Sequence, residues 1–284
     1  MSGTGLDVAA VVVDFHAGEA LATCVNSLRA NGVVDIVVVE NGEPASSALA
    51  LGELLIDLVT PGVNLGYGGG VNRGAARAPR RRYLLVSNPD VVVHDGAVEA
   101  LVRFADAHPE VGIVGPRIVA GDGTIYPSQR SFPNVWLAGA HALLEPLWAR
   151  NPATRRYRSR RSDDSVDWVS GAFMLITREV FERVGGFDER YFMFAEDMAL
   201  CWRVQKLGYG VSACDNAVVT HLEGLSRARN PRAMLIAHHR SALRFEWQTS
   251  RGLRRLLVPV ATLVLGLRLM VVLVHPGATA DTEL

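Results

Sequence analysis

LLVSNPDVVV, residues 84–93, predicts a buried strand that stops at Asn88-Pro89-Asp90 and then resumes. Pro fixes φ, and Asn and Asp bond their own backbone, so this tripeptide taken alone is ordinary turn chemistry. A buried strand that ends in a carboxylate is also how an open α/β sheet presents a cation or a polar ligand. Asp90 is therefore a candidate metal ligand, and the rest of the chain decides between these two interpretations.

The amino-terminal half alternates apolar runs of strand length with segments of helical period. Strands are expected at 8–15, 36–39, 55–59 and 84–87, and helices at 20–30, 46–53 and 71–78. In the second half we expect a strand within 168–176, helices at 178–184 and 196–207, and an apolar strand just before His221. Such alternation predicts an α/β fold, with a Rossmann-like, mostly parallel sheet and helices on both of its faces.

Composition limits the classes of protein. The 284 residues are 49% hydrophobic and 20% charged, which fits one sizeable domain, or a domain with an appendage. Lys plus Arg and Asp plus Glu both number 29, so the net charge gives no indication of nucleic-acid binding. The 3 cysteines lack zinc spacing, which favours free thiols in a reducing compartment. The start lacks a secretory signal pattern, and we expect a cytoplasmic location.

Polar side chains follow the ends of the expected strands. Asp14, Glu40, Asn41 and Asp90 each stand where a strand finishes. Ligand sites in parallel α/β sheets lie at the carboxyl ends of the strands. For any one of these residues, a solvated loop is the alternative interpretation, and their shared edge is what favours a functional site.

A glycine-rich segment, NLGYGGGVNRG, occupies residues 64–74. It differs from a dinucleotide-binding fingerprint, because that loop follows the first strand and this one follows the third. This position, with the absence of a Tyr-x-x-x-Lys pair, disfavours a Rossmann dehydrogenase. The glycines allow a ligand to approach the backbone, and the following helix start offers N–H groups to a diphosphate. A plain turn is the alternative.

The second half contains two further candidate groups. Glu196 and Asp197 stand at the start of an expected helix, where acids are favourable first-turn charges worth about 0.3 to 1 kcal/mol. Alternatively, one of them is a general base. His221 follows an apolar strand, and a lone His is more often structural than a ligand. Together with Asp90 it would complete a mixed oxygen and nitrogen cation site.

These motifs, in this order, resemble family 2 glycosyltransferases of the GT-A fold over residues 7–245. The motifs are VVDFH at 12–16, Glu40-Asn41, the segment 64–74, Asn88-Pro89-Asp90, Ser170-Gly171-Ala172, GGFD at 185–188, Glu196-Asp197 and HLEGLS at 221–226. Within this span the segments 122–128, 149–152, 185–193 and 237–241 look like actinobacterial WbbL-type rhamnosyltransferases, which build the cell-wall linker. Those enzymes move rhamnose from dTDP-rhamnose to a polyprenyl-diphosphate-linked N-acetylglucosamine.

The resemblance implies roles for the candidate residues. Asp90 and His221 would hold Mg²⁺ or Mn²⁺ on the donor diphosphate, and Asp197, beside Glu196, matches the general base of an inverting displacement. Glu40, followed by Asn41, takes the position that recognises the nucleoside. The rest of the implied donor site consists of Asp14, Asn64, Gly66, Arg73 and Asn88.

Three positions depart from the family pattern. Asn88 replaces the first acid of Asp-x-Asp, which we expect to weaken metal affinity. Ala199 replaces a second acid of Glu-Asp-x-Asp, so altered specificity or a noncatalytic, scaffolding relative is an alternative. His16 replaces a frequent Asn. A galactofuranosyl or other hexosyl transferase that uses a UDP-sugar is a further alternative, because such donors share the diphosphate and metal apparatus.

The expected organisation is a GT-A domain at 1–245, with a nucleotide-sugar half at about 1–120 and an acceptor half at about 121–245. A helical tail at 246–284 follows. Residues 256–274 are apolar apart from Thr262 and Arg268, with a basic flank before them. Because Arg268 would cost about 2.5 to 3.5 kcal/mol at mid-membrane, a helix lying on the cytoplasmic membrane surface is favoured over a span. A buried helix or a homodimer contact is the alternative.

Overall fold

The computed structural model describes residues 6–42, 44–52, 56–126, 128–132, 166–222 and 231–252, and positions 255, 256, 258, 259, 262, 263 and 266. The chain divides into two compact units. The first contains residues 1–131, 163–192 and 196–229, and the second contains 132–162, 193–195 and 230–284. The expected domain boundary at residue 245 therefore falls inside the second unit, within helix α9 (Pro231–Thr249).

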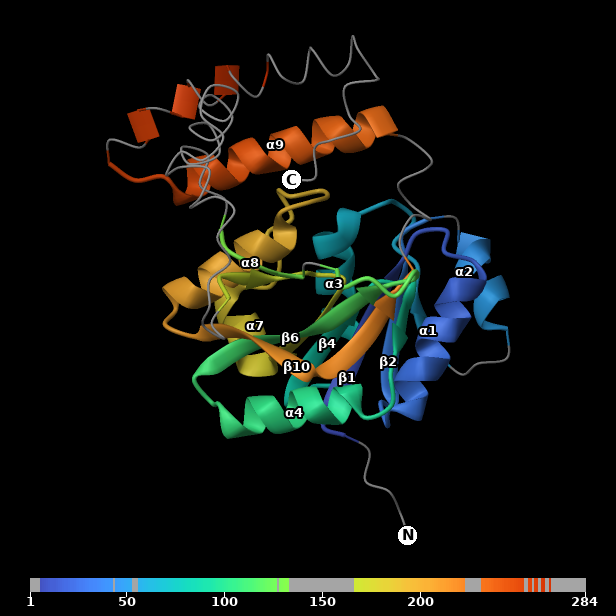
Figure 1. Cartoon of the computed structure of the whole chain (residues 1–284). Helices are drawn as coiled ribbons and strands as arrows, with labels where there is room; N and C mark the ends of the chain where they lie inside the picture. The colour runs from blue at the N-terminus through green and yellow to red at the C-terminus, as the bar shows by residue number, and fades with distance from the viewer. Residues whose placement is uncertain are drawn as a thin grey trace. The chain divides into compact units, whose positions relative to one another are not determined.

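The first unit is built on an eight-stranded sheet in the order β3-β2-β1-β4-β9-β6-β10-β5 (Figure 1). Its strands are β1 (Val8–Asp14), β2 (Asp35–Glu40), β3 (Asp57–Val59), β4 (Tyr83–Ser87), β5 (Val91–Val93), β6 (Val111–Ala120), β9 (Phe173–Thr177) and β10 (Gly210–His221). A second, two-stranded sheet pairs β7 (Gln129–Arg130) with β8 (Trp168–Val169).

Strand pairing divides the large sheet into a parallel part and a mixed part. β1 is parallel to β2 and β4, β2 is parallel to β3, and β6 is parallel to β10. β9 runs antiparallel between β4 and β6, and β5 runs antiparallel to β10. The predicted α/β class with a mostly parallel sheet is confirmed. The antiparallel insertion of β9 brings its first residues to the edge where β4 ends.

Helices cover both faces of this sheet, as predicted. They are α1 (Glu19–Ala30), α2 (Pro44–Leu51), α3 (Gly66–Arg77), α4 (Ala97–Ala107), α7 (Arg178–Val184) and α8 (Glu196–Lys206). Buried side chains of α1 and α4, such as Leu21 and Leu101, share one core with Val8 and Val12 of β1. The other face carries α3, whose glycines lie against Val11 and Val13.

Helix α3 corrects the interpretation of the glycine-rich segment. The predicted helix began at Val71, whereas the observed helix begins at Gly66 and includes most of the glycines. A Cβ added at Gly74 would lie 2.4 Å from Val11 Cγ1, and one at Gly70 would lie 2.8 Å from Val13 Cγ1. Since no side chain fits there, these glycines let the helix pack directly on the sheet. This packing outweighs the low helix propensity of glycine.

The second unit contains α9, which is held by contacts to short segments from elsewhere in the chain. Ser241 Oγ donates to Met193 O at 2.8 Å, and the rings of Phe132 and Phe245 lie 5.7 Å apart. Within the described residues, no helix is long and apolar enough to cross a membrane. Most of the apolar tail segment 256–274 lies outside them.

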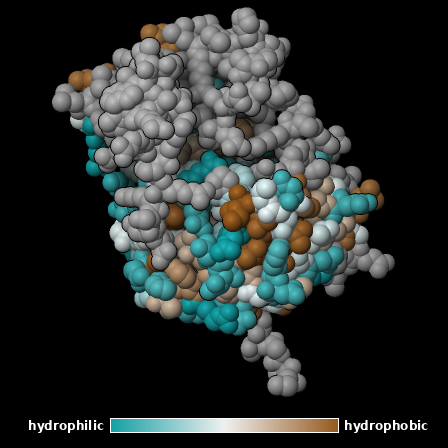
Figure 2. All heavy atoms as spheres, in the orientation of Figure 1, coloured by the Kyte–Doolittle hydropathy of each residue, from teal (hydrophilic) through white to brown (hydrophobic). Residues whose placement is uncertain are grey.

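The surface of the described residues is mixed in character. On the face drawn in Figure 2, hydrophilic and hydrophobic residues alternate, with a hydrophobic area near the middle.

All three cysteines are buried and free, as the sequence predicts.

Candidate active site

The first group of candidate residues lies where β1 and β2 end. Asp14 and Glu40 are the last residues of these parallel neighbours and stand opposite each other in register. Both side chains are buried, at 0% and 2% exposure. Parallel pairing therefore places two carboxyl groups side by side at the carboxyl edge of the sheet, where the sequence predicted them.

Ser47, on α2, joins these two carboxyl groups. Its hydroxyl contacts both Asp14 Oδ2 and Glu40 Oε2, while its N–H donates to Glu40 Oε2 at 2.8 Å. One hydroxyl has one proton to donate, so both contacts are satisfied when one carboxyl group is protonated. Burial raises the pKa of Asp14, against the opposing hydrogen bonds from Ser47 and Ala17. Burial therefore disfavours the charged form of Asp14.

Asn41 ties the end of β2 to the start of α3. Its Nδ2 donates to Gly66 O at 2.8 Å, and its Oδ1 accepts from the N–H of Leu65 at 3.4 Å. Asn64 Oδ1 accepts from the N–H of Gly66 at 2.8 Å. The structure therefore brings Asn41, Asn64 and Gly66 together in one turn.

A second group forms where β4 ends. β5 and β10 pair antiparallel with His221 opposite Val91, which places the imidazole beside Asp90. His221 Nε2 lies 3.1 Å from Asp90 Oδ1 and 3.3 Å from Asn88 Nδ2. Both side chains are mostly buried, with side-chain exposures of 12% for His221 and 11% for Asp90. Strand pairing thus brings together two predicted residues that are 131 positions apart in the sequence.

The donor set at this point fits a divalent cation. Nε2 carries either one proton or one lone pair, so it cannot satisfy both Asp90 and the Asn88 amide at once. A cation would let that lone pair and Asp90 Oδ1 act together as ligands, and imidazole with carboxylate suits metals such as Mn²⁺. Among the residues that the structure describes, no group of three or more His, Cys, Asp or Glu side chains is arranged to hold a metal ion.

The third group lies at the start of α8. Asp197 Oδ2 accepts from the N–H of Gly171 at 2.8 Å, and its Oδ1 accepts from the N–H of Met198 at 2.7 Å. Gly171 belongs to the turn before β9, and Asn88 N–H donates to Ala172 O at 2.8 Å. The antiparallel β4–β9 pairing therefore positions this turn, and with it Asp197, at the same edge as Asn88 and Asp90.

Glu196 is a buried acid with an unsatisfied oxygen. Its side chain is 8% exposed, and Oε2 has no hydrogen-bond partner among the described residues. Burial, and then the charge of Asp197, raise the pKa of Glu196 to about 8. Burial also raises the pKa of Asp197, although three backbone N–H groups oppose that rise. A pKa of about 8 keeps the proton on Glu196 at neutral pH.

We predict that Glu196→Gln stabilises the protein in alkaline solution. The folded pKa lies above that of the unfolded chain, so wild-type stability falls as pH rises from about 4.5 to 8. One pKa unit corresponds to about 1.4 kcal/mol. The neutral Gln should therefore raise the free energy of unfolding by a few kcal/mol at pH 9 and leave it unchanged near pH 4. Urea unfolding at both pH values measures it, with the exposed Glu110→Gln as control. An equal effect at both pH values would contradict the assignment.

Two positions do not join these groups. Arg73 lies two turns into α3 with an exposed side chain, and it has no hydrogen bond or ion pair to another described residue. Ala199 is fully buried in α8. An acid at position 199 would be enclosed in the protein core.

Three residues of the site carried no predicted role. They are Ser47, which links Asp14 to Glu40, and Tyr67 and Gly171, which lie next to Asp197. The sequence offered one signal for Gly171, because Ser170-Gly171-Ala172 is one of the motifs that carry the family resemblance. No sequence pattern marks Ser47. Its role follows from the hydrogen bonds that the buried Glu40 carboxylate accepts from it.

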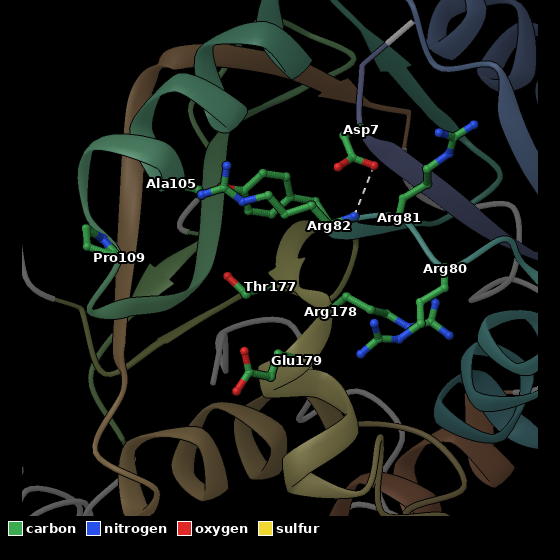
Figure 3. A pocket seen from close by; sticks show the side chains of 10 residues that line it. Asp7, Arg80, Arg81, Arg82, Ala105, Pro109, Thr177, Arg178 and Glu179 are labelled. Atoms are coloured by element: carbon green, nitrogen blue, oxygen red, sulfur yellow. Dashed lines mark hydrogen bonds between the residues drawn. The ribbon is translucent and has the colours of Figure 1, made fainter.

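A concavity of about 400 Å³ lies elsewhere, and its charge argues against a donor site. Figure 3 shows its lining, which includes Asp7, Arg80, Arg81 and Arg82. These residues precede β1 and β4, at the amino edge of the sheet. The three arginines pair with Glu182, Asp35 and Asp106 at 2.8, 2.6 and 2.8 Å. Their charges are thus already compensated, on the edge opposite Asp90.

Comparison with known proteins agrees with this architecture. Residues 10–185 match the family model Glycosyl transferase family 2. An N-acetylglucosaminyl-diphospho-decaprenol L-rhamnosyltransferase of Mycobacterium tuberculosis is 37% identical over 234 residues, which are 77% of this chain and 76% of the relative. The mannosyltransferase PcManGT of Pyrobaculum calidifontis, in complex with GDP-Man and Mn²⁺, is similar in structure. Its TM-score is 0.57 at 14% identity, over 97% of this chain and 76% of that chain.

GalNAc-T7 with UDP, GalNAc and Mn²⁺ also has a TM-score of 0.57, at 17% identity, over 77% of this chain and 43% of that chain. The sheet and these structural neighbours show the GT-A fold. More particularly, the chain belongs to glycosyl transferase family 2. The resemblance inferred from the motifs, including that to cell-wall rhamnosyltransferases, is confirmed.

Proposed function

We propose that this glycosyltransferase transfers L-rhamnose from dTDP-rhamnose to a polyprenyl-diphosphate-linked N-acetylglucosamine, with inversion at the anomeric carbon. The observation that carries the proposal is that Asp90, His221 and Asp197 meet at one edge of the sheet. The similarity to the mycobacterial rhamnosyltransferase, over three quarters of both chains, supports the choice of donor and acceptor.

In this proposal the donor occupies the ends of β1, β2 and β4. Asn41 and Asn64 order the first turn of α3 beside it, and Asp14 and Glu40 with Ser47 form the buried floor. Glu40 Oε1 also accepts from the N–H of Gly42 at 2.7 Å, so both of its oxygens hold the loop that follows β2. We assign Glu40 the task of shaping the nucleoside pocket from behind.

The reaction we propose is a single displacement. Asp197 accepts the proton of an acceptor hydroxyl while that oxygen attacks the anomeric carbon. The bond from this carbon to the diphosphate oxygen breaks on the opposite face, and its electron pair leaves with the nucleoside diphosphate. Glu196 stays protonated, which keeps the site at one negative charge and leaves Asp197 as the base.

Asp90 and His221 would hold Mg²⁺ or Mn²⁺ at the donor diphosphate. When bound, the cation neutralises the charge that builds on the leaving group. Asn88 Nδ2 lies 3.3 Å from His221 Nε2, so the amide stands beside the position of the cation. An amide there, where the family pattern has an acid, contributes no charge to the pair.

A transfer assay tests the proposed substrates. Radiolabelled dTDP-rhamnose and UDP-sugars are offered with detergent-solubilised prenyl-diphosphate-N-acetylglucosamine, with Mn²⁺ or with EDTA. We expect metal-dependent label in the lipid from dTDP-rhamnose alone. Label from a UDP-sugar would overturn the donor assignment and keep the fold and mechanism. A protein that binds nucleotide without any transfer would favour a noncatalytic relative, in line with Ala199.

We also propose that the second unit contacts the cytoplasmic membrane surface, where a lipid-linked acceptor is presented. Trp247, Leu256 and Leu263 are 52%, 74% and 64% exposed. The guanidinium of Arg255 lies 4.6 Å from the Trp247 ring centroid. Exposed Trp and Leu beside Arg are typical of helices that lie in the interface of an anionic bilayer. Co-sedimentation with anionic vesicles that fails for wild type would refute this part.

A further inference from the structure

We infer that Tyr67 is a positioning residue for Asp197, because its side chain fixes Gly171, and Gly171 in turn fixes the Asp197 carboxylate. The inference rests on the proposed function in one respect, since Asp197 is taken as the base. Tyr67 would thereby connect helix α3, which carries it, to Asp197 at the start of α8.

The link consists of two hydrogen bonds on either side of one residue. Tyr67 Oη donates to Gly171 O at 2.5 Å. The N–H of Gly171 donates to Asp197 Oδ2 at 2.8 Å. Since both bonds belong to Gly171, a shift of its carbonyl also moves the N–H that holds the carboxylate. Tyr67 and Asp197 are 130 positions apart, yet only one residue separates them in this chain of bonds.

Packing leaves Gly171 little freedom to move. A Cβ at this position would lie 3.0 Å from Asp197 Cβ and 3.4 Å from both Asp197 Oδ2 and Tyr67 Cε1. Glycine is therefore the residue that lets the phenol ring and the carboxylate approach the same backbone. This close fit transmits the position of the ring to the carboxylate.

Tyr67 is itself held from both ends. Its N–H donates to Phe192 O at 3.3 Å, and its ring packs edge-on against Phe187 with centroids 6.1 Å apart. It stands in the first turn of α3, next to Gly66, which Asn41 and Asn64 bind. Burial, and then the charges of Glu196 and Asp197, raise the pKa of Tyr67 well above its ordinary value. The hydroxyl accordingly stays protonated at neutral pH and can act as a donor.

Tyr67→Phe tests the inference, because it removes the hydroxyl and keeps the ring. The matched control is Tyr83→Phe, which removes a hydroxyl that donates to Asp106 Oδ1 at 2.7 Å, away from the site. We expect Tyr67→Phe to lower kcat about 10- to 100-fold, as for a catalytic group misplaced by a fraction of an ångström to 1 Å. The KM for the donor and the Kd of the nucleoside diphosphate should stay within about twofold of wild type.

The pH dependence of kcat separates positioning from a merely structural role. Glu196, Tyr67, Cys201 and Arg130 face Asp197 electrostatically, and the Gly171 N–H is one of the groups that lower its pKa. In Tyr67→Phe the Gly171 N–H is held less firmly and lowers the pKa of Asp197 less. The acid limb of the kcat profile should therefore move to higher pH. A variant that only unfolds more easily would lose active protein and keep the wild-type profile.

Gly171→Ala provides a second variant, which keeps the hydroxyl and displaces Asp197 by contact with the new Cβ. It should reproduce the loss of kcat with unchanged donor binding. Wild-type kcat and acid limb in Tyr67→Phe would overturn the inference. Asp197→Asn in the same assay distinguishes the two failures. If Asp197→Asn is inactive and Tyr67→Phe is normal, the inference alone fails. If Asp197→Asn is active, the proposed base is wrong.

Discussion

Asp197→Asn lowers kcat by about 10³-fold and leaves nucleoside diphosphate binding intact. General base catalysis contributes about 10² to 10⁴ in rate, and the amide cannot take up a proton from the acceptor. Asp197 is bound by two backbone N–H groups, whereas Asn can offer an oxygen to only one of them. We therefore also expect a loss of about 1 to 3 kcal/mol in the free energy of unfolding.

Steady-state transfer kinetics and calorimetric titration with dTDP check this prediction, and urea unfolding accounts for the stability loss. Asp215→Asn, which changes an exposed aspartate bonded to Gln129, is the matched control. Full activity of Asp197→Asn in a folded protein would remove the proposed base. Loss of nucleotide binding along with activity would mean that Asp197 shapes the donor pocket.

Asp90→Asn abolishes the effect of Mn²⁺ on donor binding and lowers kcat/KM by about 10³-fold. A metal that neutralises the leaving group is worth several kcal/mol, and about 1.4 kcal/mol corresponds to a tenfold change in rate. With Asn at both 88 and 90, His221 would remain beside two amides and no carboxylate. The pair would then lack the negative charge that attracts a divalent cation.

The measurement is the Kd of dTDP with Mn²⁺ and with EDTA, for wild type, Asp90→Asn and the exposed control Asp95→Asn. Wild type and Asp95→Asn should bind dTDP more tightly with Mn²⁺, and Asp90→Asn should bind it equally in both buffers. This readout does not depend on turnover. A Mn²⁺ effect that survives in Asp90→Asn would place the cation elsewhere.

The parallel half of the fold is predictable from sequence because its signals are local. The apolar runs at 8–15 and 36–39 are too continuous for amphipathic helices, and each ends in a polar residue that marks the sheet edge. The positions of Asp14, Glu40 and Asp90 follow from the rule that parallel strands end at one edge. Strands β1 and β2 end at Asp14 and Glu40, whereas Asp90 lies between the end of β4 at Ser87 and the start of β5 at Val91.

The remaining features depend on contacts between distant residues. Helix α3 begins in a glycine run that propensity alone would leave as a loop, and it forms because Gly70 and Gly74 pack on β1. The antiparallel position of β9 is set by pairing with β4 and β6. Tyr67 and Gly171 gain their roles from that placement, so no local pattern marks them.

The sheet order also has a consequence for biosynthesis. β5 lies at the end of the sheet and pairs with β10, the last strand of the sheet in the chain, which also pairs with β6. A nascent chain that has emerged only as far as Leu207 carries every carboxylate assigned above and lacks both β10 and His221. Its sheet then presents unpaired edges, which invite aggregation. Catalytic competence is thereby confined to polypeptides whose translation has passed His221.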